Sequence, residues 1–382
     1  MTSIRPPFSA LASNEIFAIT DTSAQVVVRP ESASTTGVEV RVGERTIAVA
    51  CESGVGVAEI DGLTPDAPFR LQIIDNFGEV VEELQGKTRP HLSAATKIAT
   101  ISDVHLGASK FGPSGKISDH KSPPYPLRCG RAAVDEAVAW GAEVLVIKGD
   151  LTDTGARDEW TMAEEMLDGI EIPIMITSGN HDVWSTREVM PAIGAESIGR
   201  SVEDVQTLDI GGSRIVLVDT SLPGRGWGDL ARHRDLIKAA VDVEQSVLLC
   251  LHHHLQRTPV PWFWPPGIPP SNAMPVVEEL FEINPAVMIT AGHTHRNRRH
   301  HVLDANVTFT EVASTSDYPG VWAGYEISAD TFRQTVRRIA SPDATSWTEA
   351  TRAALGTVWP RWSQGRLDDR CVDVAIPTGS VA

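Results

Sequence analysis

The chain has 382 residues, enough for two domains, and 42% of them are hydrophobic, as is usual for soluble globular proteins. No apolar run approaches the roughly 18 residues that a membrane span needs, and the first residues have no apolar segment typical of a secretion signal. We therefore expect a cytoplasmic protein without a membrane partner. The formal net charge of -17 disfavours binding to nucleic-acid polymers and to anionic lipid.

Residues 1–92 are expected to form a small all-β domain. Runs that alternate or carry β-branched residues, separated by turn residues at short intervals, predict the strands of a sandwich at 25–29, 37–42 and 69–74. The segment 60–69 resembles the turn before the late strands of fibronectin type III domains, with Phe69 where many of them have a tyrosine. This resemblance implies a fibronectin type III-like β-sandwich.

Residues 93–340 show the pattern of an α/β domain. Continuous apolar strands are predicted at 98–101, 144–147, 172–176, 214–218, 246–251 and 286–289, with weaker ones at 307–312 and 321–327. Helical spacing at 131–140 and 156–167 alternates with the first of them. This alternation predicts a largely parallel sheet covered on both faces. Residues 341–382 are expected to be a C-terminal extension, for which the sequence predicts no chemistry.

Polar residues follow five of these strands at the point where each strand ends. They are Asp103 and His105, Asp150, Asn180 and His181, His252, and His293 and His295. Carboxylate, amide and imidazole groups suit borderline divalent metals. Because the carboxyl ends of parallel strands meet at one edge of a sheet, the sequence predicts a metal site there.

The spacing of these residues has a physical reason. In Asp103-x-His105 and His293-x-His295, two residues one apart in an extended segment point the same way, so that both can reach one site. The two carboxylate oxygens of Asp150 can bridge two cations. Two cations about 3.5–4 Å apart clamp a phosphoryl group and generate hydroxide from water near neutral pH.

The order DxH, GD, GNH, H and GHxH between residues 96 and 328 resembles the metal-site signature of the calcineurin-like metallophosphoesterases. The resemblance implies a four-layer α/β/β/α domain after the sandwich. It also implies two metal ions, the first held by Asp103, His105, Asp150 and His295, and the second held by Asp150, Asn180, His252 and His293. His181 would be the catalytic histidine that contacts the substrate or protonates the leaving oxygen, and Asp153 would hold its ring by a hydrogen bond. A structural role for His181, and a helix N-cap before Ala156 for Asp153, are the alternatives.

Differences from two groups of metallophosphoesterases indicate which group the chain resembles most. Asp153 stands where purple acid phosphatases have a metal-binding tyrosine, and Thr154 stands where Ser/Thr protein phosphatases have a phosphate-binding arginine. The segments 149–155 and 219–224 and the pair His252-His253 resemble the bacterial cyclic-nucleotide and glycerophosphodiester phosphodiesterases. There a proline usually follows the two histidines, whereas here His254 does. Which of the three histidines is the ligand therefore stays open.

The favoured hypothesis is a phosphoesterase that hydrolyses small-molecule phosphodiesters, such as cyclic nucleotides or glycerophosphodiesters, by a metal-bound hydroxide. The cofactors would be two divalent or mixed-valence ions of manganese, iron or zinc. The alternatives are a phosphomonoesterase of the same fold and a binding protein with a vestigial metal site. The sequence leaves open whether the protein is a homo-oligomer.

Overall fold

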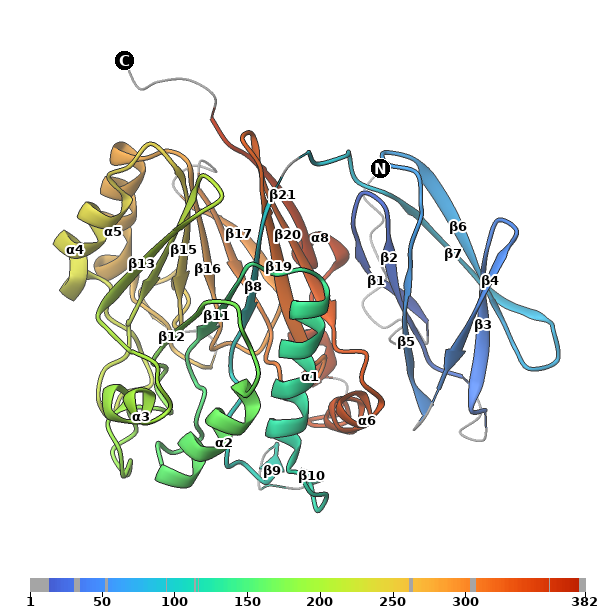
Figure 1. The fold of residues 1–382 in the computed structure, drawn as a ribbon, viewed down its shortest axis with the longest axis horizontal. Coiled ribbons are helices and arrows are strands. Elements are labelled where there is room, and N and C mark those ends of the chain that lie inside the picture. The colour runs from blue at the N-terminus through green and yellow to red at the C-terminus, as the bar shows by residue number, and fades with distance from the viewer. Residues whose placement is uncertain are drawn as a thin grey trace. The chain divides into compact units, whose positions relative to one another are not determined.

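The computed structural model describes residues 14–30, 35–51, 54–93, 95–112, 115, 117–260, 264–302, 307–356 and 358–377. The chain divides after His91 into two compact units (Figure 1). Among the described residues, no helix has the length and apolar character that crossing a membrane requires.

The first unit consists of two antiparallel sheets. Its strands are β1 (Glu15–Ile19), β2 (Ala24–Val28), β3 (Gly37–Val42), β4 (Arg45–Ala50), β5 (Gly56–Ile60), β6 (Pro68–Ile74) and β7 (Val80–Lys87), in the orders β1-β2-β5 and β4-β3-β6-β7. In β6, Phe69, Leu71 and Ile73 are buried while Arg70 is exposed, as the period of two in a half-buried strand requires. The expectation of an all-β region before the α/β region is confirmed.

One sheet of the second unit begins with parallel strands and ends with antiparallel ones. Its order is β12 (Ile174–Thr177), β11 (Val144–Lys148), β8 (Thr96–Ile101), β19 (Val321–Ile327), β20 (Thr331–Arg338) and β21 (Cys371–Ala375). Strands β8, β11 and β12 are mutually parallel, and β19, β20 and β21 pair antiparallel. The C-terminal extension thus supplies an edge strand of this sheet.

The other sheet is parallel in its centre. Its order is β13 (Val205–Ile210), β14 (Ser213–Val218), β15 (Ser246–Leu251), β16 (Val287–Ala291), β18 (Val307–Glu311) and β17 (Arg298–Val302). The outermost strands β13 and β17 pair antiparallel with their neighbours. Strands β14, β15 and β16 are almost wholly buried, which explains why the sequence shows them as continuous apolar runs.

Helices cover the outer face of each sheet (Figure 1). The first sheet packs against α1 (Tyr125–Ala139), α2 (Arg157–Leu167) and α6 (Pro342–Thr351), and the second packs against α4 (Arg234–Val241) and α5 (Pro270–Ile283). Shorter elements are β9 (Lys110–Phe111), β10 (Ile117–Ser118), α3 (Pro191–Ser197), η3 (Ala231–His233), α7 (Val358–Ser363) and α8 (Leu367–Arg370).

The inner faces of the two sheets meet through a few buried polar contacts. Lys148 Nζ donates to Thr290 Oγ1 at 3.0 Å, and Thr290 Oγ1 lies 2.7 Å from the Tyr325 hydroxyl. The layers are therefore α/β/β/α, which confirms the expected fold class. The strand pattern predicted one sheet, whereas the structure has two. The apolar strands show that both faces of a sheet are buried, but not whether a helix or another sheet covers each face.

Candidate metal centre

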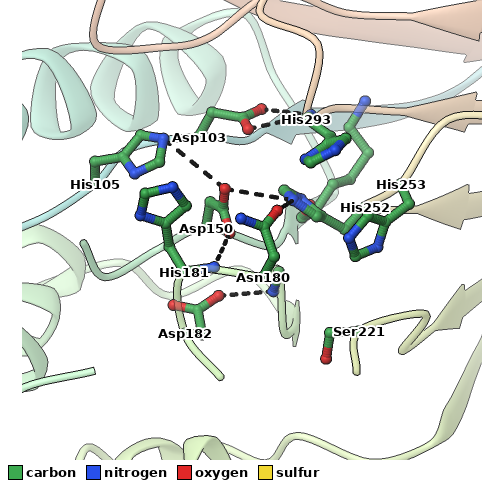
Figure 2. Close-up of polar contacts among 12 residues, drawn as sticks. Asp103, His105, Asp150, Asn180, His181, Asp182, Ser221, His252, His253 and His293 are labelled. Carbon is green, nitrogen blue, oxygen red and sulfur yellow. Dashed lines mark hydrogen bonds and ion pairs between the residues drawn. The ribbon is translucent and has the colours of Figure 1, made fainter. Parts of the chain in front are cut away.

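The candidate ligands lie in the loops that directly follow five strands from the two sheets. Asp103 and His105 follow β8, Asp150 follows β11, Asn180 follows β12, His252 follows β15, and His293 and His295 follow β16. Figure 2 shows the side chains of the labelled residues among them facing one another. Asp103, His105 and His295 have ligand atoms within 4.8 Å of one another, and so do Asp103, Asp150 and His252. The fold therefore brings the predicted residues to one place.

The backbone of this centre is not extended, contrary to the expectation behind the D-x-H spacing. Five residues of the centre have φ between 48° and 69°, in the left-handed region that residues other than glycine rarely adopt. They are Asp103, His105, Asp150, His293 and His295. The residues of each pair still converge, but through tight loops after the strands and not through strand alternation. Five strained positions in one site are typical of a functional centre.

The first half of the centre is built around His295. Its Nδ1–H donates to Asp317 Oδ2 at 2.6 Å, which leaves Nε2 facing the centre. There Nε2 lies 3.4 Å from Asp103 Oδ1 and 3.4 Å from His105 Nε2. Two imidazole nitrogens and a carboxylate oxygen thus point at one position.

The second half is built around His252 and Asp150. His252 Nδ1–H donates to the Lys148 carbonyl at 2.8 Å, and Nε2 lies 3.2 Å from Asn180 Oδ1 and 3.4 Å from Asp150 Oδ2. Asp150 Oδ1 accepts the His181 backbone N–H at 2.8 Å. Asp150 Oδ2 is also 3.9 Å from His105 Nε2, so this carboxylate lies between the two halves (Figure 2).

The three consecutive histidines have different surroundings. His253 Nδ1 lies 2.9 Å from Thr220 Oγ1, and its buried Nε2 has no hydrogen-bond partner among the described residues. The His253 ring centroid is 4.6 Å from that of His293, and His252, His253 and His293 form another group of potential ligands. The ring of His254 lies farther out, 5.9 Å from His293 between centroids. Only His252 contacts Asp150 and Asn180.

His181 lies at the margin of the centre with its side chain partly exposed. Its Nδ1–H donates to the Asp153 backbone carbonyl at 2.8 Å, and the Asp153 carboxylate is 3.5 Å from the same nitrogen. The carboxylate of Asp153 is also 3.4 Å from His105 Nδ1. The N-cap of α2 is Ala156, whose backbone N–H donates to Glu159. Asp153 therefore faces two histidines of the centre.

Neighbouring charges and burial shift the pKa values of the acids and histidines of the centre. Burial raises the pKa of Asp103 and of Asp150, but His295 acting on Asp103 and His252 acting on Asp150 lower both below their usual range. Burial lowers the pKa of His252, but Asp150 raises it more, to about 9. Burial together with His252 lowers the pKa of His293 to about 3. The buried carboxylates thus stay ionised and require positive charge beside them.

The donor set fits metal ions. When His252 and His295 are neutral, Nδ1 carries the proton and the lone pair of Nε2 faces carboxylate or amide oxygens. The lone pair and these oxygens repel each other unless a cation or a proton lies between them. A ligating histidine commonly donates its other N–H to a carbonyl or carboxylate in this way. Nitrogen and oxygen donors of this kind suit zinc, manganese or iron.

Some supporting residues were not predicted from the sequence. Asp317 holds His295, and Asp182 accepts hydrogen bonds from the backbone N–H groups of Thr152 and Gly179 at 2.8 and 2.7 Å, which ties two ligand loops together. Lys148 is buried between the sheets. Asp317 ends the polar run 314–317 that follows β18. A search for polar residues after strand ends, as used for the candidate ligands, could therefore have found it.

A family model of the calcineurin-like phosphoesterases matches residues 96–297, more than half of the chain. Over 161 residues the chain is 30% identical to the 3',5'-cyclic adenosine monophosphate phosphodiesterase CpdA of Pseudomonas aeruginosa, covering 40% of this chain and 54% of that protein. Over 124 residues it is 24% identical to the probable glycerophosphodiester phosphodiesterase GpdQ of Arcobacter nitrofigilis, covering 29% and 41%. The chain thus spans about half, or less, of the length of these curated relatives. A purple acid phosphatase from yellow lupin seeds aligns with a TM-score of 0.47 at 11% identity, covering 86% of this chain and 73% of that one.

Proposed function

Because the chain belongs to the calcineurin-like phosphoesterase family, we propose that it hydrolyses phosphodiesters at a centre of two metal ions. The observation that carries this proposal is the convergence of the Asp103, Asp150, His252 and His295 side chains on shared positions between the carboxyl ends of strands from two sheets.

We propose the two ligand sets that the family resemblance implies. Asp103, His105, Asp150 and His295 would hold one ion. Asp150, Asn180, His252 and His293 would hold the other, with Asp150 shared between them. When bound, such ions polarise the phosphoryl oxygens and lower the pKa of a nearby water, the chemistry that phosphoester hydrolysis needs. We propose His252 as the ligand of the histidine triplet, since its Nε2 faces Asp150 and Asn180.

His181 is proposed to protonate the leaving oxygen. Burial lowers its pKa, but Asp150 and Asp153 raise it more, to about 10. Nδ1 donates to the Asp153 carbonyl, and among the described residues nothing bonds Nε2, which therefore can carry a proton towards the substrate. Asp153 is proposed to fix the ring and to favour its charged form.

The surroundings of the centre favour diesters over monoesters. A monoester dianion carries one more negative charge and is commonly met by an arginine fork. Three arginines that flank the motifs pair with carboxylates: Arg128 with Asp119, Arg131 with Asp135, and Arg296 with Glu311. The names of the similar relatives, which are phosphodiesterases, agree with this preference.

The test compares bis(p-nitrophenyl) phosphate with p-nitrophenyl phosphate at neutral pH, with the same manganese loading measured for both assays. We expect the higher kcat/KM for the diester. A clear preference for the monoester would establish the phosphomonoesterase alternative instead, and protein that binds little metal and turns over neither substrate would establish the vestigial one.

A further inference from the structure

A cavity of about 670 Å³ lies beside the metal centre. Its walls come from the loop after β15, from β17 and β18, and from the C-terminal segment around α8. Five arginines line it, namely Arg257, Arg296, Arg298, Arg299 and Arg366. Such a concentration of positive charge is unexpected in a chain whose formal net charge is -17.

The two carboxylates of the cavity do not neutralise it. Glu311 accepts hydrogen bonds from Arg296 at 2.6 and 3.0 Å and lies 2.5 Å from His300 Nε2. Asp369 accepts the backbone N–H groups of Arg299 and Arg366 at 3.0 and 2.8 Å. Among the described residues, no carboxylate lies within ion-pair distance of the guanidinium groups of Arg257, Arg299 or Arg366. These three remain available to an anionic ligand.

Two residues that line the cavity, His254 and Arg296, are close in sequence to candidate metal ligands. His254 directly follows His252 and His253, is 7% exposed, and its Nδ1 has no hydrogen-bond partner among the described residues. Arg296 directly follows His295 and stacks on Trp362, with its guanidinium carbon 4.3 Å from the ring centroid. The cavity therefore adjoins the metal centre at these two side chains.

We propose that the cavity binds a second phosphate group of the substrate, carried on one arm of the diester whose scissile phosphate lies at the metal centre. This inference rests on the proposed function. Planar guanidinium groups bind phosphate through paired hydrogen bonds. The substrate class is then a phosphodiester with an additional terminal phosphate, and Arg366 makes the C-terminal segment part of the binding site.

The experiment uses two chromogenic diesters that differ only in the second phosphate: thymidine 5'-(p-nitrophenyl phosphate) and its 3'-phosphorylated form. In the native enzyme we expect kcat/KM to be about tenfold higher for the phosphorylated diester, mainly through a lower KM, since a hydrogen bond to a charged group is worth about that factor. Arg299→Ala or Arg366→Ala should reduce this ratio towards one. Arg361→Ala, an exposed arginine of the same segment outside the cavity, should keep it. Equal kcat/KM for both diesters, or a ratio that both cavity variants retain, would overturn the proposal.

A binding measurement separates this inference from the proposed function. Inorganic pyrophosphate is titrated calorimetrically into metal-free full-length protein, where the arginines must supply the binding. We expect binding that Arg299→Ala weakens about tenfold or more and Arg361→Ala leaves unchanged. If neither diester is hydrolysed by metal-loaded protein while pyrophosphate binding depends on Arg299, the proposed function fails and the anion site stands. If pyrophosphate does not bind, the anion site fails.

Discussion

Glu311→Gln is a sharp test of the electrostatics beside the metal centre. The Glu311 carboxylate is 0% exposed and accepts two hydrogen bonds from Arg296, which is itself 12% exposed, while His300 contacts the same carboxylate. Removing one charge from a buried pair costs about 3–5 kcal/mol, and the glutamine oxygen restores a hydrogen bond worth about 1 kcal/mol. We therefore expect the free energy of unfolding to fall by about 3 kcal/mol at neutral pH.

The pH dependence of this loss has a definite sign. Burial raises the pKa of Glu311, but His300 and Arg296 more than offset this and hold the pKa below its ordinary value of 4.5. Because the pKa of Glu311 is lower in the folded than in the unfolded protein, its ionised carboxylate stabilises the fold. This stabilisation is complete above about pH 4.5 and is lost as the pH falls through the pKa of the folded protein. The difference between native and variant should therefore shrink at acid pH.

Urea unfolding followed by tryptophan fluorescence, with and without EDTA, measures both effects. The matched control is Glu279→Gln, which removes a carboxylate that pairs with Arg234 and Lys238 at the surface, where the side chains of Arg234 and Glu279 are 46% and 25% exposed. Exposed pairs contribute less than about 1 kcal/mol. Equal losses for the two variants, or a Glu311→Gln loss that does not change with pH, would refute the reasoning.

Three further predictions concern the centre and the domains. Asp150→Ala should lower turnover at least about 100-fold and release at least one ion by elemental analysis, because Asp150 contacts both halves of the centre, whereas the exposed Asp343→Ala should change neither. Near-normal turnover with two ions bound would exclude a bridging Asp150. A chain that begins at Leu92 should keep its metal and part of its activity, since the candidate ligands all lie in the second unit; folded, metal-loaded and inert protein would show that the first unit completes the site. His181→Asn should lower kcat about 100-fold for a diester with an alkoxide leaving group, but much less for p-nitrophenolate, and should leave the metal content unchanged. Loss of metal instead would make His181 a ligand.

Much of the fold could be predicted because burial leaves a clear pattern in its strands. The runs at 144–147 and 246–251 became β11 and β15 with little change of boundary. Helix α1 begins at Tyr125, six residues before the predicted start at residue 131. The prediction began too late because Pro124 and Pro126 are typical of a loop. Proline is compatible with the first turn of a helix, where its missing N–H has no intrahelical acceptor. The sequence pattern alone does not distinguish this use of proline from a break.

The C-terminal residues show what the sequence could not reveal. Helix α6 and strand β21 belong to the second unit, where Trp347 packs against the core and β21 pairs with β20. Their stretches are short and mix apolar with charged residues, so that neither helical nor strand periodicity stands out. Their burial depends on partners distant in sequence.

The convergence of the candidate ligands was expected from the sequence, but the extended backbone given as its reason was wrong, because five of these residues are left-handed. Five left-handed residues cost about 1 kcal/mol or more each, which together is comparable to the net stability of a domain. Backbone hydrogen bonds between the loops offset this cost: Asp103 N–H donates to the Gly149 carbonyl at 3.1 Å, and His105 N–H donates to the Asp150 carbonyl at 3.0 Å. The Ser314 and Ser316 hydroxyls donate to the Asp103 carbonyl at 2.9 and 3.1 Å. Since protein groups make these bonds, the scaffold itself contributes to holding the loops in their left-handed conformations.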